Sequence, residues 1–350
     1  MRGNSLTGWS RRGTAFQAIP RHVTRDTFPG LLQHTQINLP TPPKELMQNN
    51  LSYSLRQALP ATVRSASWLL KLMIPVSLLV TLLQHFGVLE RIAVVLNPVF
   101  SHLGLPGASS VTFISGAAAG TYAGIAAMMS MPLSVKEATV LSLMIALCHA
   151  LPMECAVNRK TGSSFWKMCL LRILMAFLCA AVVSRLLPDT AGRFIYIGAA
   201  ADSTFTRVML TWLLSQLKIS AVVFLIIYSL MVVQRLIEAY SLLQPLSTLL
   251  APLMRLFGLP PETAYMWLVG NVLGISYGSA VMVELEERGI ITRSEANDVN
   301  YHLIMNHSLL EDTIVFALVG ISAPLLVGVR VVFAMMLVWA HRLFRHVFVR

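Results

Sequence analysis

The chain alternates long apolar stretches with short polar breaks over most of its 350 residues. A helix that crosses a lipid bilayer needs about 20 consecutive, predominantly apolar residues. The longest apolar stretches are Trp68–Val88, Val111–Met131, Met168–Leu187, Val208–Val233 and Thr313–Trp339. This pattern predicts an all-α integral membrane protein.

We expect five apolar elements in each half of the chain, in the same order. The first half has them at 65–87, 89–103, 109–131, 135–152 and 165–187, and the second at 206–234, 240–257, 262–284, 295–311 and 313–341. The second and fourth elements are short and bounded by proline or glycine, so tilted helices, half-helices and re-entrant hairpins all stay open. The predicted domains are a polar, basic leader at 1–50, expected to be disordered, and two tandem units at 51–190 and 205–345.

Matching residues indicate that the two units arose by duplication. Each unit carries three glycines at four-residue spacing, followed by a histidine, a carboxylate and an arginine. At an offset of 154 the matched glycines are Gly116/Gly270, Gly120/Gly274 and Gly124/Gly278. At an offset of 158 the other matched pairs are His149/His307, Glu154/Asp312 and Arg172/Arg330.

The distribution of lysine and arginine predicts that the second unit is inverted relative to the first. An odd number of crossings per unit places the second unit upside down, and cytoplasmic segments carry the excess of basic residues. With the N-terminus inside, the predicted cytoplasmic segments hold 17 Lys/Arg and the outer segments four. Inverted repeats are typical of secondary transporters. We therefore expect both termini to be cytoplasmic.

Composition agrees with a membrane protein and argues against nucleic-acid binding. The chain is 55% hydrophobic and 12% charged, whereas about 25% charged is usual in soluble domains. The formal net charge is +11, and the first 64 residues hold eight Lys/Arg and only two acidic residues. This basic segment lacks the combination of basic and aromatic residues that a nucleic-acid-binding module has. The four cysteines lie in or beside apolar segments without a CxxC motif, which favours buried, reduced thiols.

The glycine triplets predict close contact between helices. Residues four apart nearly eclipse on a helix, so each triplet leaves one face without side chains and lets another backbone approach. We expect the two units to cross at these faces: Gly116, Gly120, Gly124, Gly270, Gly274 and Gly278. Helix packing without any role in a solute path is the alternative.

Ionisable and polar residues inside apolar segments are the candidate functional residues, because burying them costs a few kcal/mol. The candidate solute or ion path is lined by His149, Glu154, Asn271, Asn306, His307, Glu311 and Asp312. On a regular helix His307 and Glu311 share a face, whereas Pro152 re-aims Glu154 by breaking the helix. The alternatives are solvated clusters at the membrane surface, or metal binding by histidine and carboxylate.

Arg172 and Arg330 are expected to balance the carboxylates, with snorkelling to the membrane surface as the alternative. The sequence has no GxxxxGK[ST] or HExxH motif. We therefore expect no cofactor, no nucleotide-driven step and no enzyme activity.

The glycine-rich element and the duplicated His-Ser/Ala-Leu-x-x-Glu/Asp segment resemble the Gate domain, also called the nucleoside-recognition domain. Spore maturation proteins A and B, the membrane part of ferrous-iron transporter B and concentrative nucleoside transporters share that domain. The resemblance covers residues 65–345 as two fused copies. The resemblance implies a multi-pass protein of the bacterial inner membrane with a solute or ion path between the copies. This chain lacks the iron transporter's GTPase domain and the full substrate pattern of a nucleoside transporter.

The leading hypothesis is an inner-membrane secondary transporter or channel-like permease for a small polar solute or ion. The alternative is a membrane scaffold in envelope or spore assembly, and a membrane enzyme has the least support. The expected partners are the lipid bilayer and an unknown small solute or ion, not nucleic acid. The sequence does not identify the solute or the oligomeric state, and a homo-oligomer is one of the open alternatives.

Overall fold

A computed structural model describes residues 50–189, 192–195 and 204–348, and the predicted leader lies outside these ranges apart from residue 50. The regular elements in the described ranges are helices, and a single β-bridge joins Ser134 to Arg193. Four segments are long and apolar enough to cross a membrane: Val135–Lys160, Phe165–Leu186, Phe205–Ile237 and Ala323–Val347. The prediction of an all-α integral membrane protein is confirmed.

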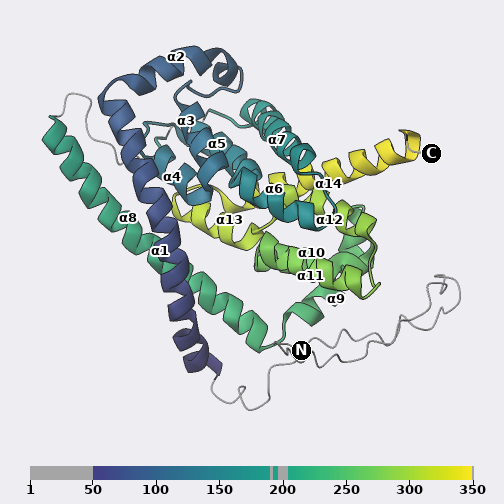
Figure 1. Cartoon of the computed structure of the whole chain (residues 1–350). Helices are drawn as coiled ribbons and strands as arrows, with labels where there is room; N and C mark the ends of the chain where they lie inside the picture. The colour runs from purple at the N-terminus through teal and green to yellow at the C-terminus, as the bar shows by residue number, and fades with distance from the viewer. Residues whose placement is uncertain (1–49, 190–191, 196–203, 349–350) are drawn as a thin grey trace, which may run out of the picture. The chain divides into compact units, whose positions relative to one another are not determined.

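The helices repeat in order in the two halves of the chain (Figure 1). The first half comprises α1 (Asn50–His85), α2 (Val88–Ser101), α3 (Ser109–Ala119), α4 (Thr121–Met129), α5 (Val135–Cys148), α6 (Leu151–Lys160) and α7 (Phe165–Leu186). The second half comprises α8 (Phe205–Ala239), α9 (Leu243–Leu256), the short 3-10 helix η3 (Pro261–Thr263), α10 (Ala264–Val272), α11 (Ile275–Glu287), α12 (Arg293–Asn306), α13 (Leu309–Leu318) and α14 (Ala323–Phe348).

Each half has two helix breaks. The break in the third element was not predicted, and the break in the fourth was predicted only in the first half, near Pro152. The third element is interrupted at Gly120, with φ of 105°, and at its equivalent Gly274, with φ of 96°. The fourth is interrupted at Ala150, with φ of 44°, and at its equivalent Ser308, with φ of 50°. The continuous helices predicted at 109–131 and 262–284 are therefore wrong, because the central glycine adopts a conformation that only glycine reaches easily.

Matched helix starts come from matched local sequences. Ser134 and Glu137 form a capping box at the start of α5, and Thr292 and Glu295 form the same box at the start of α12. In this motif each partner accepts a backbone N–H that the first helical turn leaves free. The two boxes fix where the helices that carry the candidate histidines begin.

Equivalent helices α1 and α8 pack along each other in opposite directions (Figure 1). Residues late in α1 meet residues early in α8: Gln216 donates from Nε2 to Ser77 Oγ at 2.7 Å, and the His85 and Phe205 rings lie 5.3 Å apart. Contacts between the halves are also reciprocal, since α5 packs on α14 and the equivalent α12 packs on α7. This is the arrangement expected of an inverted repeat.

The glycines allow close approach inside each half, which corrects the predicted crossing between the units. An ideal Cβ at Gly124 would lie 3.1 Å from Gly116 Cα, and one at Gly278 would lie 2.8 Å from Gly270 Cα. The triplets thus let α3 pack on α4 and α10 pack on α11 as tight hairpins. The middle glycine of each triplet makes the turn rather than a contact face.

Helix α7 shows how the fold separates lipid-facing from inward-facing residues. Leu170, Leu174 and Leu178, four residues apart, are 58%, 54% and 48% exposed. Arg172 on the same helix is fully buried. An apolar stripe of this kind is stable against lipid tails, so α7 directs Arg172, the charged residue away from its ends, into the protein.

Candidate functional site

The candidate site forms where α5 and α12 end. His149 and His307 follow the last residues of these helices in extended conformation, and a left-handed residue comes next in each case. The N–H of Ala150 donates to Gly116 O at 3.1 Å, and the N–H of Ser308 donates to the equivalent glycine carbonyl at 3.2 Å. Each glycine hairpin therefore holds the turn that carries its own histidine.

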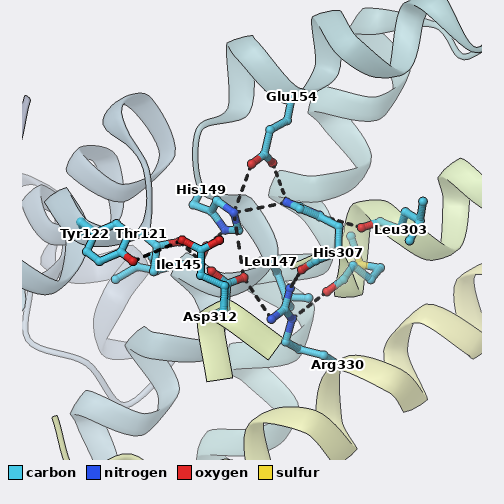
Figure 2. A network of polar contacts seen from close by, with 12 residues as sticks. Thr121, Tyr122, Ile145, Leu147, His149, Glu154, Leu303, His307, Asp312 and Arg330 are labelled. Carbon is cyan, nitrogen blue, oxygen red and sulfur yellow. Dashed lines mark hydrogen bonds and ion pairs between the residues drawn. The ribbon is translucent and has the colours of Figure 1, made fainter. Parts of the chain in front are cut away.

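The two histidines meet between the halves of the protein (Figure 2). His149 Nδ1 lies 3.2 Å from Ile145 O, and His307 Nδ1 lies 2.7 Å from Leu303 O. A carbonyl only accepts, so both Nδ1 atoms carry the hydrogen. The Nε2 atoms point toward each other and are 3.2 Å apart.

Glu154 bridges the histidine pair from the first turn of α6 (Figure 2). Its Oε1 lies 3.1 Å from His149 Nε2, and its Oε2 lies 3.0 Å from His307 Nε2. Arg172 Nη1 donates to Oε2 at 2.5 Å. The break was predicted near Pro152, but the structure places it at Ala150, and Pro152 lies in the first turn of α6.

Both arginines bind the carbonyl ends of the interrupted helices. Arg172 donates from Nε to Leu147 O and from Nη2 to His149 O, each at 2.9 Å. Arg330 makes the equivalent bonds to the end of α12, at 3.0 and 2.7 Å. Both side chains are fully buried, so the snorkelling alternative is wrong. Cations in this position are favourable because carbonyls at a helix C-terminus carry partial negative charge.

The second half differs from the first in its carboxylates. Asp312, one methylene shorter than Glu154, forms an ion pair with Arg330 at 3.1 Å, and its Oδ2 lies 4.0 Å from His149 Nε2. Thr121 Oγ1 donates to Asp312 Oδ1 at 3.2 Å from the opposite half. The duplicated residues therefore form one site with unequal sides.

Glu311 does not share a helix face with His307, which corrects the prediction. The two residues belong to different helical segments because Ser308, with φ of 50°, separates them. Tyr122 OH donates to Glu311 Oε1 at 3.2 Å. Glu311 thus contacts α4 of the opposite half, beside the Thr121–Asp312 bond.

The two candidate asparagines lie next to the site in sequence but bond within their own half. Asn271 is buried and donates from Nδ2 to Trp267 O at 2.9 Å. Asn306 is buried with its Oδ1 3.0 Å from His302 Nδ1. The Trp267 indole donates to the same nitrogen at 2.9 Å, so that nitrogen carries no hydrogen to donate to the amide oxygen. This tryptophan–histidine pair was not predicted from sequence, because α12 (RSEANDVNYHLIMN) is polar over much of its length and one more polar residue does not stand out in it.

The site is enclosed and bears ligands suitable for a cation. Among the described residues, His149, Glu154 and His307 form a buried group whose potential metal-ligating atoms lie within 4.8 Å of one another. Each of these side chains is at most 8% exposed. The surface-solvated alternative for this cluster is therefore wrong.

Comparison with known proteins identifies similarity in the same region. Residues 66–165 match the Gate family, described as nucleoside recognition. The chain is 30% identical over 283 residues to the uncharacterized membrane protein YvoD of Bacillus subtilis (strain 168), an alignment that covers 78% of this chain and 89% of that protein. No solved structure matches. The matched residues contain the first glycine triplet, His149 and Glu154.

Proposed function

Because this chain belongs to the Gate (nucleoside recognition) family of membrane proteins, we propose that it is an inner-membrane transporter or channel-like permease. Its solute or ion path runs between the two inverted halves, through the cluster that His149, Glu154, His307 and Asp312 form. The substrate is a small polar solute or an ion. Both chain termini lie on the cytoplasmic side, as the distribution of Lys/Arg predicts.

The observation that supports the proposal is a buried charged cluster at interrupted helices. Arg172 and Arg330 are fully buried, and Glu154 and Asp312 are 6% and 4% exposed. Replacing a buried ion pair by apolar residues is often neutral or stabilising, so such pairs are poor stabilising elements. Interrupted helices that meet between inverted repeats form the binding sites of many secondary transporters.

Transport is tested with purified protein in liposomes. The probes are radiolabelled uridine and adenosine and, with an entrapped metal-sensitive dye, Mn²⁺, Co²⁺ and Zn²⁺. We expect flux of at least one probe above that of empty liposomes, and at least a tenfold loss in Glu154→Gln and Asp312→Asn. Glu284→Gln is the matched control, because that carboxylate is partly exposed and pairs with Arg288. Unchanged flux in both cluster variants would contradict the proposal.

The second candidate function is a non-transporting membrane scaffold. The close pairing of the cluster favours it, since Arg172 donates to Glu154 at 2.5 Å and to two backbone carbonyls at 2.9 Å. Cys155, buried beside Glu154 in sequence, distinguishes the two functions. In a variant that keeps only this cysteine, a membrane-impermeant thiol reagent labels Cys155 if the path opens to water. A scaffold leaves it unlabelled.

A further inference from the structure

The hydrogen bonds of the two histidines create an electrostatic problem at their other nitrogens. Because both Nδ1 atoms donate to backbone carbonyls, each neutral imidazole has an unshared electron pair on Nε2. These two electron pairs face each other at 3.2 Å and face the Glu154 carboxylate at 3.1 and 3.0 Å. In each of these three contacts a hydrogen-bond acceptor then faces another acceptor, which is unfavourable. A cation placed between the two nitrogens and the carboxylate makes all three contacts favourable.

We propose that His149, Glu154 and His307 bind a divalent transition-metal ion at the contact between the two halves. The proposal does not depend on transport, because a bound ion can be a structural element, a regulator or the cargo.

The separations of the donor atoms fit coordination of one ion. Nitrogen and oxygen ligands lie about 2.0–2.2 Å from zinc, so neighbouring ligands of a tetrahedral site are about 3.3–3.6 Å apart. Octahedral coordination with the same bond lengths brings them to about 2.8–3.1 Å. The Nε2 atoms of His149 and His307 are 3.2 Å apart, between the two ranges. Glu154 Oε1 lies 3.1 Å from the first nitrogen and Glu154 Oε2 lies 3.0 Å from the second, so the carboxylate offers one oxygen beside each histidine.

The surroundings already hold the ligands in place. Metal-binding histidines almost always donate their second nitrogen to a carbonyl or carboxylate, and both histidines do so here. Arg172 fixes the Glu154 carboxylate at 2.5 Å. Asp312 Oδ2 lies 4.0 Å from His149 Nε2, but its ion pair with Arg330 Nη1 at 3.1 Å holds it outside the set of three ligands.

The ligand types select the class of metal. Two imidazoles and a carboxylate suit Zn²⁺, Fe²⁺, Co²⁺, Ni²⁺ or Mn²⁺, whereas Ca²⁺ and Mg²⁺ prefer oxygen alone and Cu⁺ prefers sulfur. The charges of Arg172 and Arg330 offset those of Glu154 and Asp312. The ion is therefore bound without a strong excess of negative charge, which favours reversible binding.

Binding is measured on the full-length protein, purified in detergent and stripped with a chelator. Co²⁺ is added and followed by its visible absorption spectrum, and bound metal is counted by mass spectrometry after gel filtration. We expect one Co²⁺ per chain, displaced by Zn²⁺, and at least a tenfold weaker affinity in His149→Gln, Glu154→Gln and His307→Gln. His346→Gln is the matched control, because that histidine is exposed on α14.

Three outcomes would overturn the metal site: no stoichiometric binding by the wild type, equal affinity in all three variants, or equal loss in the control. Absence of stoichiometric binding by the wild type would indicate that a proton shared between the two Nε2 atoms, and not a metal ion, holds the histidines together. Electron paramagnetic resonance of bound Mn²⁺ or Cu²⁺ provides a readout that does not depend on the variants. Nitrogen coupling from two imidazoles supports the site, and its absence contradicts it. Because binding is measured in detergent, failed transport leaves this result intact, and failed binding leaves the transport test intact.

Discussion

A methyl group at Gly278 tests the close packing behind the candidate site. An ideal Cβ there would lie 2.8 Å from Gly270 Cα, closer than real Cβ contacts come. The nearest atom belongs to the backbone and cannot rotate away, so α10 and α11 must move apart. Overpacking of this kind lowers the free energy of unfolding by about 1–3 kcal/mol. The better helix propensity of alanine offsets about 0.5–1 kcal/mol of that. We expect Gly278→Ala to lower the free energy of unfolding by about 1–2 kcal/mol.

Two other glycine-to-alanine variants serve as comparisons for Gly278→Ala. Gly328 on α14 has no atom within 4 Å of an ideal Cβ, so Gly328→Ala is expected to be neutral or slightly stabilising. At Gly124 the Cβ would lie 3.1 Å from the facing Cα, so Gly124→Ala is expected to fall between the other two. The assay is reversible unfolding of the purified protein in mixed detergent micelles. Equal stability of the Gly278 and Gly328 variants would refute the packing argument.

The same variant affects the histidine turn. Gly270 O accepts the N–H of Ser308 at 3.2 Å, so a shift of α10 displaces the residue that follows His307. We expect Gly278→Ala to weaken Co²⁺ binding several-fold, while Gly328→Ala leaves it unchanged. Lower stability together with unchanged affinity would show that the hairpin does not position the histidine.

The remaining predictions concern single interactions, each measured by the same unfolding assay. Gly274→Ala forces an L-residue to φ of 96° and is expected to cost at least about 1–3 kcal/mol; no loss would show that the turn relaxes easily. Arg172→Met leaves Glu154 buried without its cation and is expected to cost about 3–5 kcal/mol, against little change for the lipid-facing Leu174→Met. A small effect, equal to that of the leucine variant, would contradict the ion pair. Ser134→Ala removes the cap of α5 and is expected to cost about 1 kcal/mol, and an unchanged midpoint would count against the capping box.

The duplication and the chemistry of the site could be predicted from sequence because both are recorded in residue type and spacing. Charged residues in apolar segments are costly, so His149, Glu154 and Arg172 stood out without any structure. Their equivalents at an offset of 158 pointed to a shared site between the units. The limits of the two predicted domains stay a prediction, since the described halves pack together.

The exact positions of the helix breaks could not be predicted because they depend on backbone conformation. Glycine at every fourth position suits a packed helix face as well as a turn, and only the φ of 105° at Gly120 distinguishes the two. Ala150 and Ser308 are in the left-handed region, which their residue types do not favour. The placement of Glu311 against Tyr122 follows from these breaks, so its partner could not be predicted either.

The central claim is that two inverted halves meet at His149 and His307, and cross-linking tests it most directly. The native cysteines are replaced by alanine, His149→Cys and His307→Cys are combined, and a protease site is inserted between α7 and α8. A short bis-methanethiosulfonate reagent is added in native membranes before cleavage. The account predicts that the cleaved halves stay joined on a denaturing gel until a reductant separates them, while each single-cysteine variant separates at once. Separation of the double variant to the same extent as the single variants would contradict the claim.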